Sequence, residues 1–280
     1  FLNLASNQIS DITALANLTN LNKLWLGGNP LTAVARPIIE SLEAGGTTVE
    51  HDPLPDPAVV SIPDNNLRAA LESALGKNAG DAITDVELAT LTDLNAAESS
   101  ITDLTGLEFC INLESLKLGG NSISDISAVA NLTNLTTLYL GDNEISDISA
   151  VANLTTLTYL VLDDNQISDI TAVSNLTGLT YLDLSGNQIS DITAVANLTN
   201  LTVLDLNDNQ LRDLTKLANL TNLTRLDLSG NQLTDLAELA NLTNLTVLDL
   251  SQNQLKDLPG LANLTNLTRV YLSQNQLKDL

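Results

Sequence analysis

The chain contains few of the residues on which catalytic and metal sites usually depend. It has one cysteine, Cys110, one histidine, His51, and no methionine. One cysteine cannot form a disulfide within the chain, and a catalytic triad, a Cys/His pair or a histidine-rich zinc site would have to include one of these two residues. Nothing in the sequence around them supports such a site. We therefore expect no catalytic residue, no metal site and no cofactor.

Aromatic and basic residues are scarce as well. Phe, Trp and Tyr make up 2% of the 280 residues and apolar residues 44%, so leucine, isoleucine, valine and alanine must fill the interior. The formal net charge of −23 argues against nucleic acid and anionic lipid headgroups, which bind basic surfaces. No apolar run approaches the roughly 18 residues of a membrane span. The expected partner is a protein, for which a basic surface would be complementary; nucleic acid and membrane insertion are not expected.

The chain is rich in one repeated motif. From Leu113 onward the pattern L-x-x-L-x-L-x-x-N-x-[IL], that of the leucine-rich repeat, returns every 22 residues. Alternation such as that in residues 138–140 is typical of a short strand, and one unit cannot bury its leucines without its neighbours. So short a unit leaves little room for a full helix. We expect an α/β leucine-rich repeat solenoid: a curved parallel β-sheet with short 3-10 or extended convex segments and helical caps.

One asparagine recurs at the same inward position of each unit. A buried amide needs hydrogen-bond partners, which backbone groups of its own and the adjacent coil can supply. A degenerate unit precedes the regular ones and has Ser99 in this position. The predicted structural asparagine ladder comprises Asn121, Asn143, Asn165, Asn187, Asn209, Asn231, Asn253 and Asn275.

A single interruption of the repeat predicts two arrays. Residues 1–52 are expected to be the C-terminal end and closing cap of a first array. Its helix should begin near Pro37 and stop at residues 45–46, both glycines, before one last short strand. Residues 53–60 contain three prolines and are predicted to form a linker.

The second array is predicted to begin with its own cap. Residues 61–110 should form a helical N-terminal cap with a degenerate first repeat, in which Asp64 caps one helix and Thr84 and Glu87 form a capping box at another. Residues 111–280 are predicted to be eight 22-residue repeats without a closing cap. The expected molecule is thus a fragment with two open solenoid edges.

The cap and the repeat together resemble a known family. The segment SIPDNNLRAALESALGKNAGDAITDVELATLTDLNAAESSITDLTGLEFCINLESLKL looks like the helical cap and first repeats of bacterial internalin-type proteins. The unit NLTNLTxLxLxxNxISDI is similar to the repeat they share with eukaryotic phosphatase-regulatory repeat proteins. The resemblance covers residues 61–280. It implies a bacterial binding module without catalysis, secreted or exposed at the cell surface.

Leucine-rich solenoids usually bind partners on the concave strand face, and two groups of residues there are candidates for partner binding. Tyrosine is frequent at binding hot spots, although strand surfaces also favour it. Stacked aspartates repel one another; they could be solvated consensus residues, a surface for a basic partner, or a loose Ca²⁺ site with Asp163, Asp164 and Asp208. The first group is Tyr139, Tyr159, Val161 and Tyr181, and the second is Asp183, Asp205, Asp227 and Asp249.

Three functional hypotheses follow. The leading one is a non-enzymatic protein-recognition module that binds through the concave strand face. The near identity of the repeats also suits a structural spacer or scaffold within a surface protein of several arrays. The repeat type alone suggests an intracellular enzyme-regulatory repeat protein.

Overall fold

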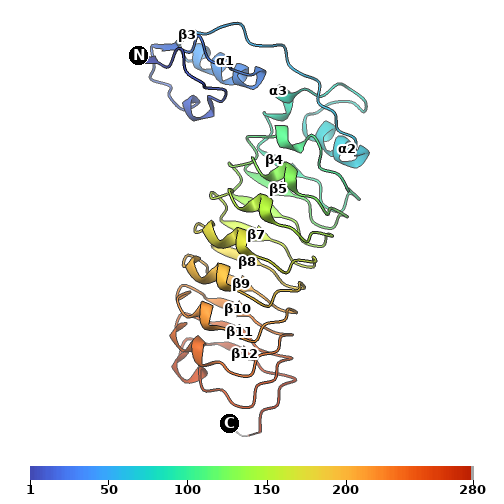
Figure 1. The fold of residues 1–280 in the computed structure, drawn as a ribbon, viewed down its shortest axis with the longest axis vertical. Coiled ribbons are helices and arrows are strands. Elements are labelled where there is room, and N and C mark those ends of the chain that lie inside the picture. Colours follow the sequence, from blue (N-terminus) through green and yellow to red (C-terminus); the bar gives the residue numbers. More distant parts are fainter. Residues whose placement is uncertain (279–280) are drawn as a thin grey trace.

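The computed structural model describes residues 1–278 and contains two stacks of parallel strands (Figure 1). The small array is a three-stranded sheet in the order β1 (Leu2–Asn3), β2 (Lys23–Trp25) and β3 (Thr48–Glu50). The large array is a nine-stranded sheet whose strands follow one another in chain order. The predicted leucine-rich repeat solenoid is thereby confirmed. The last two residues of the predicted range 111–280 lie outside the described residues.

The strands of the large array pair in register, one repeat apart. Leu160, for example, lies opposite Leu182, and Leu182 opposite Leu204. Because the register equals the repeat, each side chain lies beside its counterpart in the next coil. The strands are β4 (Asp93–Asn95), β5 (Ser115–Lys117), β6 (Thr137–Tyr139), β7 (Tyr159–Val161), β8 (Tyr181–Asp183), β9 (Val203–Asp205), β10 (Arg225–Asp227), β11 (Val247–Asp249) and β12 (Arg269–Tyr271).

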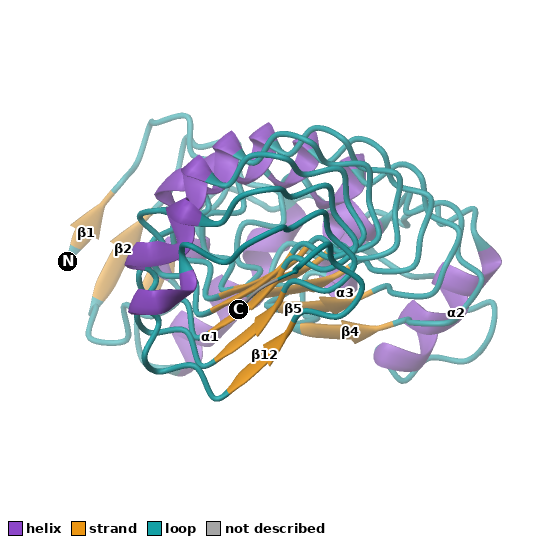
Figure 2. Ribbon diagram, turned by 90° about the horizontal axis from the view of Figure 1, so that it is seen from below, coloured by secondary structure: helices purple, strands orange, loops and turns teal. Residues whose placement is uncertain are grey.

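Short 3-10 helices lie on the side opposite the strands, as Figure 2 shows. Buried Val129, Leu132 and Leu135 each donate their N–H group to the carbonyl three residues earlier, the hydrogen bond that defines 3-10 geometry. The prediction of short 3-10 segments is confirmed. These are η1 (Thr13–Leu15), η2 (Ala33–Ala35), η3 (Leu107–Phe109), η4 (Ser127–Val129), η5 (Ser149–Val151), η6 (Thr171–Asn175), η7 (Thr193–Asn197), η8 (Thr215–Leu217), η9 (Ala237–Asn241) and η10 (Leu261–Asn263).

Leucine, isoleucine and valine fill the space between strands and 3-10 helices. The large array and its cap share one continuous cluster of buried side chains, and the small array has another. Cys110 takes an inward position with no exposed surface. Burial, with a smaller contribution from the charge of Glu108, raises the pKa of its thiol to about 12. At neutral pH Cys110 is therefore a small apolar core residue.

Helices cover the ends where the two arrays meet. In the small array, α1 (Arg36–Ala44) has Pro37 in its first turn and ends at Gly45, and β3 follows. The helices α2 (Asn65–Ala74) and α3 (Asp85–Leu88) precede the large sheet. Asp64 accepts hydrogen bonds from two backbone N–H groups of α2, and Thr84 and Glu87 form the capping box of α3. These predicted helix boundaries are confirmed.

The chain between the arrays is attached to the cap of the large array. Val60 N–H donates to Ile83 O at 2.9 Å, and Asp85 N–H donates to Ala58 O at 3.0 Å. Val60 is buried, and Val59 forms an antiparallel bridge with Thr84. The end of the predicted linker is thus held by the cap, and the division of the chain into modules stays a prediction. None of the helices between residues 1 and 278 has the length and apolarity that crossing a bilayer requires.

Candidate functional site

The ladder asparagines hold the turns that follow the strands. The side-chain amide of Asn187 donates to Leu162 O, Leu184 O and Ser185 O at 2.9, 3.1 and 3.0 Å. Its Oδ1 accepts from Ile167 N–H at 2.9 Å. The partners belong to its own coil and to the preceding one. The same contacts recur, within about the same distances, at Asn143, Asn165, Asn209, Asn231 and Asn253, all buried, and at the partly buried Asn121 and Asn275.

The three predicted tyrosines lie on adjacent strands and contact one another. Tyr159 and Tyr181 occupy the same register position, and their rings stack with centroids 4.0 Å apart and planes 8° apart. Tyr139 pairs with Val161 and therefore meets Tyr159 diagonally, at 5.1 Å and 34°. The three tyrosines and Val161 are all half-buried. We call Tyr139, Tyr159 and Tyr181 the tyrosine stack.

The stack has an apolar character despite its hydroxyl groups. Burial, followed by the neighbouring tyrosines, raises the pKa of Tyr159 above its ordinary value, and burial also raises that of Tyr181. Both phenols are therefore neutral at physiological pH. Lys117 Nζ lies 5.4 Å from the Tyr139 ring and covers one end of the stack. The arrangement offers a flat, neutral aromatic surface on an otherwise acidic chain.

The predicted aspartate column continues the same face. Asp183, Asp205, Asp227 and Asp249 are in register and half-buried. Each accepts a hydrogen bond from the backbone N–H two residues later, at 2.9 to 3.1 Å. The acceptor therefore helps to hold the turn after its strand. Sequence reasoning missed this role, although the recurring D-x-[SN] spacing carries the signal.

Burial and repulsion both act on the centre of this column. Burial, together with the charges of Asp183 and Asp227, raises the pKa of Asp205 to about 6 despite its hydrogen bonds to Asn207. Within residues 1–278 no group of three His, Cys, Asp or Glu side chains is placed to hold a metal ion. The carboxylates of the column lie side by side on adjacent strands.

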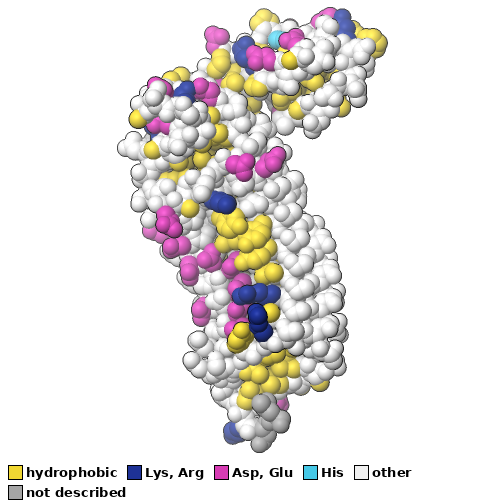
Figure 3. All heavy atoms as spheres, turned by 180° about the vertical axis from the view of Figure 1, so that it is seen from behind, with side chains coloured by type: hydrophobic (Ala, Val, Ile, Leu, Met, Phe, Trp, Pro, Cys, Tyr) yellow, Lys and Arg dark blue, Asp and Glu magenta, His cyan; other side chains and the backbone are white. Residues whose placement is uncertain are grey.

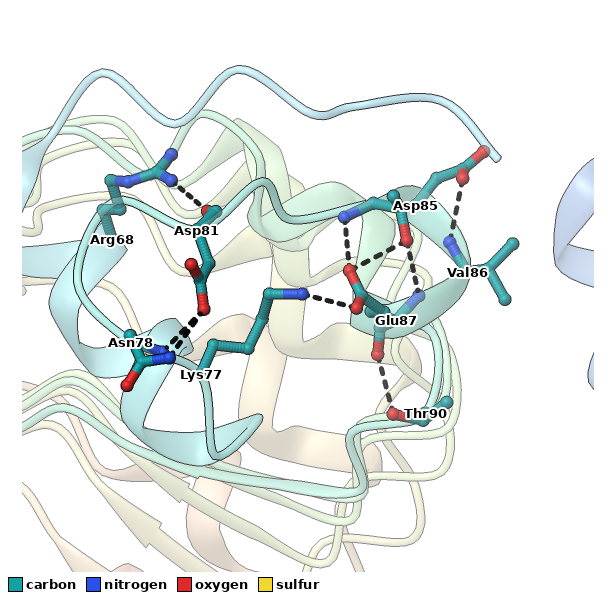
Figure 4. A network of polar contacts seen from close by, with 9 residues as sticks. Arg68, Lys77, Asn78, Asp81, Asp85, Val86, Glu87 and Thr90 are labelled. Carbon is teal, nitrogen blue, oxygen red and sulfur yellow. Dashed lines mark hydrogen bonds and ion pairs between the residues drawn. The ribbon is translucent and has the colours of Figure 1, made fainter. Parts of the chain in front are cut away.

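Charge compensation in the described residues is found elsewhere. Figure 4 shows the cap, where Lys77 pairs with Glu87 at 2.5 Å. In the same cap Arg68 pairs with Glu72 at 2.9 Å. The pairing with Lys77, partly opposed by burial, lowers the pKa of Glu87. In contrast, the ion pairs found within residues 1–278 include none on the strands of the large array. Figure 3 shows hydrophobic side chains gathered midway along that array, with acidic side chains beside them.

Comparisons with known proteins give one family. The family model "Leucine Rich repeats (2 copies)" matches residues 1–39, 111–153, 199–241 and 243–280, and the model "Leucine rich repeat" matches residues 133–189. A search of curated proteins finds no match.

Solved structures give a more specific likeness. The chain is 38% identical to the internalin InlF of Listeria monocytogenes, with a TM-score of 0.69 over 80% of this chain and 74% of that one. It is 40% identical to internalin C2 of the same organism, with a TM-score of 0.72 over 75% of this chain and 94% of that one. A leucine-rich repeat protein of Leptospira interrogans, 22% identical with a TM-score of 0.50 over 99% of this chain and 79% of that one, shares the fold.

Proposed function

The chain belongs to the internalin-type leucine-rich repeat proteins, and on that premise we propose that it is a non-enzymatic module for protein recognition. The module belongs to a secreted or surface-exposed bacterial protein, and it binds its partner through the strand face of the large array. The carrying observation is the tyrosine stack, in which three of the four tyrosines of the chain meet on adjacent strands.

The stack suits an anchor for two physical reasons. Aromatic side chains at the centre of an interface often cost at least about 2 kcal/mol of binding when truncated. The parallel ladder and the asparagines hold the backbone beneath the rings, and the rings hold one another. Little conformational freedom is therefore lost when a partner covers them, and more of the burial energy remains for affinity.

The clustering of the tyrosines favours recognition over a spacer role. The corresponding positions in later coils carry Val203, Arg225, Val247 and Arg269 rather than tyrosine. A spacer has no need for an aromatic cluster on one part of its sheet. An intracellular regulator would use the same face, and the origin of the captured partner separates it from an extracellular module.

The test is a capture experiment with matched variants. Immobilised protein is exposed separately to biotinylated host-cell surface proteins and to cytosolic extract, and bound proteins are identified by mass spectrometry. We expect a partner from the surface fraction, held at least about tenfold more weakly by the Tyr139→Ala, Tyr159→Ala, Tyr181→Ala variant. The control carries alanine at the exposed Thr133, Thr155 and Thr177, on the same coils outside the strands.

Two results would count against the proposal. Undiminished capture by the folded tyrosine variant would show that the partner does not bind at the tyrosine stack. A partner found only in the cytosolic extract would favour the intracellular regulator instead.

A further inference from the structure

A hollow floored by glycine adjoins the tyrosine stack. Gly119 and Gly141 follow β5 and β6, at a position where later coils carry aspartate, serine or asparagine, as at Asp163, Ser185 and Asn207. The backbone of Gly119, Gly120 and Gly141 forms the floor of an open depression of about 570 Å³. These three glycines add no side chains of their own to this space.

Three carboxylates line this hollow, and two lie directly over its glycines. A Cβ atom on Gly141 would be 1.9 Å from Asp163 Oδ1, and one on Gly120 would be 3.0 Å from Glu98 Cγ. Asp142 is the third. None of the three has an ion-pair partner among residues 1–278.

The hollow and the tyrosine stack form one continuous surface. Val161 lines the hollow and lies opposite Tyr139 in the sheet. The hollow spans the coils from Glu98 to Asp163, and the stack spans the coils of β6 to β8. Adjacent strands are about 4.8 Å apart, and every second side chain of an extended peptide lies on the same face. Two side chains at positions i and i+2, or i and i+4, can therefore reach both.

We propose that the partner presents such an extended segment, with an apolar side chain on the tyrosine stack and an arginine whose guanidinium enters the glycine-floored hollow. This inference rests on the proposed function and specifies the chemistry of the partner. The guanidinium is planar, carries five donors in a fixed fork and binds carboxylates in pairs, which fits a shallow site with carboxylates on its sides. It would neutralise charges that the described residues leave unpaired.

Charge complementarity selects this occupant over others. An anionic segment would meet Glu98, Asp142 and Asp163 at close range, and a wholly apolar one would desolvate them without supplying a partner. Burial, followed by the charges of Asp183, Asp164 and Asp142, raises the pKa of Asp163 above its ordinary value, so a cation there relieves an existing repulsion. The nearby Lys117 amine is directed to the Tyr139 ring instead.

The test uses the full chain and three synthetic peptides that differ at one residue. The sequence Ser-Leu-Gly-Ser-Gly-X-Ser, in which Leu and X share one face of an extended chain, is made with arginine, with the isosteric neutral citrulline, or with glutamate at X. Binding is followed by NMR at the backbone amides of Gly119, Gly120 and Gly141 and at the tyrosine rings. We expect the arginine peptide to shift all of these signals, with an affinity at least about tenfold above that of the citrulline peptide. The glutamate peptide should bind more weakly still.

Matched variants separate the hollow from general electrostatics. The Glu98→Gln, Asp142→Asn, Asp163→Asn variant keeps side-chain shape and should lower the affinity for the arginine peptide to that for citrulline. The Asp191→Asn, Asp213→Asn, Asp235→Asn control makes the same change in net charge at exposed residues outside the strands and should retain the preference. Gly119→Ser, which copies the residue of a later coil, should fill the hollow and weaken only arginine binding.

Each contrary outcome is decisive. Equal binding of the arginine and citrulline peptides, or an equal loss in both triple-charge variants, would overturn the inference. If the natural partner is lost by the tyrosine variant but fully retained by the Glu98, Asp142, Asp163 variant, the proposed function stands and the arginine assignment is wrong.

Discussion

The small array and the large array share the same coil, and they differ in how the ends of their sheets are completed. In the large array, Gly120 N–H donates to Gly141 O of the next coil at 2.9 Å. The equivalent Gly28 N–H of the small array donates to the carboxylate of Asp52, which follows the last strand, β3, at 2.6 Å. A side chain thus supplies the acceptor that a neighbouring backbone supplies inside the array.

The first coil of the large array also has its hydrogen bonds completed by groups outside the repeat. A ladder asparagine bonds its own coil and the preceding one, as Asn121 does with Leu118 O and Ala96 O. The first coil has no preceding coil, so its position can be filled by Ser99 without an unmet hydrogen bond. Asp64 and Asn66 of the cap contact this coil instead, at Thr102 N–H and Ser100 O. The repeat is regular where coils meet coils, and it departs from the consensus where they do not.

The largest expected effect tests whether ladder asparagines stabilise interior coils more than the coil at the end of the array. Asn187→Ala leaves Ile167 N–H and two or three carbonyls without partners in a buried site, and it should lower the free energy of unfolding by about 3–5 kcal/mol. The same change at the partly buried Asn275 should cost less than about 2 kcal/mol. Urea denaturation followed by circular dichroism measures both. Equal losses would mean that the ladder is not what distinguishes interior coils.

A pair of truncations tests whether the large array is a module separate from the small one. A chain starting at residue 57 keeps the contacts of Ala58 and Val60 with the cap, whereas one starting at residue 61 loses them. We expect both to fold, the shorter one less stable by about 2–4 kcal/mol because Val60 is buried and bonded to Ile83 O. A chain starting at residue 53 is the control and should match the longer one. If neither truncated chain folds, the two arrays form one cooperative unit.

The edge aspartates provide a direct comparison of the two arrays. Asp64 accepts from the N–H groups of Asn66, Leu67, Thr102 and Asp103, and its replacement by alanine should cost about 2 kcal/mol. Asp52→Ala removes the acceptor of a single N–H group and should cost about 1 kcal/mol. Differential scanning calorimetry should show both losses. A larger loss of stability at Asp52 than at Asp64 would contradict the view that the loss grows with the number of N–H groups left without an acceptor.

The Asp64 effect should also depend on pH. Partial burial opposes the charged form, but the four backbone N–H groups outweigh it and hold the pKa of Asp64 below its ordinary value of 3.8. A lowered pKa adds stability above the unfolded value, and this stability is lost as the pH falls through the folded value. Asp64→Asn should therefore cost stability at pH 7 and progressively less below pH 3.8. A cost that stays constant down to the lowest pH would contradict this assignment.

The smallest expected effect concerns how the two sheets treat charge. Glu50 on the small sheet pairs with Lys23 at 2.5 Å, whereas Asp205 on the large sheet lies between Asp183 and Asp227. A raised carboxyl pKa means that the folded state holds the proton more tightly, so stability falls as the pH rises from 3.8 to about 6. After allowance for solvent screening, Asp205→Asn should stabilise the protein by about 1 kcal/mol at pH 7.5.

The pH dependence provides the control for this prediction. Below pH 3.8 Asp205 is protonated in both states, and the gain from Asp205→Asn should disappear. Asp249 pairs with Asp227 on one side and Tyr271 on the other, so Asp249→Asn should gain less at pH 7.5. Thermal unfolding of both variants at pH 3.5 and pH 7.5 measures the difference. A gain from Asp205→Asn that is unchanged at pH 3.5 would contradict the repulsion argument.

Much of this fold could be predicted because the same contacts recur. The 22-residue spacing already requires that Leu160 lie beside Leu182, and short coils require 3-10 segments. The capping residues Asp64 and Thr84 act within a few residues of themselves, so local chemistry identifies them. The proximity of the three tyrosines followed from the register as well.

Contacts without a repeat could not be predicted in this way. Ala58 meets Asp85 across 27 residues, and Asp52 reaches a glycine in the preceding coil. The 22-residue register places Asp163 beside Gly141, but only the tertiary structure shows that its carboxylate turns over the glycine, with Oδ1 1.9 Å from the position of a Cβ atom there. The half-burial of the aspartate column likewise depends on the turns that follow the strands.

The spacing of leucines and asparagines determined the solenoid, its register and the residues that share its strand face, because a repeated unit buries its apolar side only against copies of itself. The tertiary structure decided how the edges are completed, which aspartates are partly buried and where the face is hollow. Those features depend on side chains that meet only after the coils have stacked, and on distances that a repeated sequence pattern does not contain.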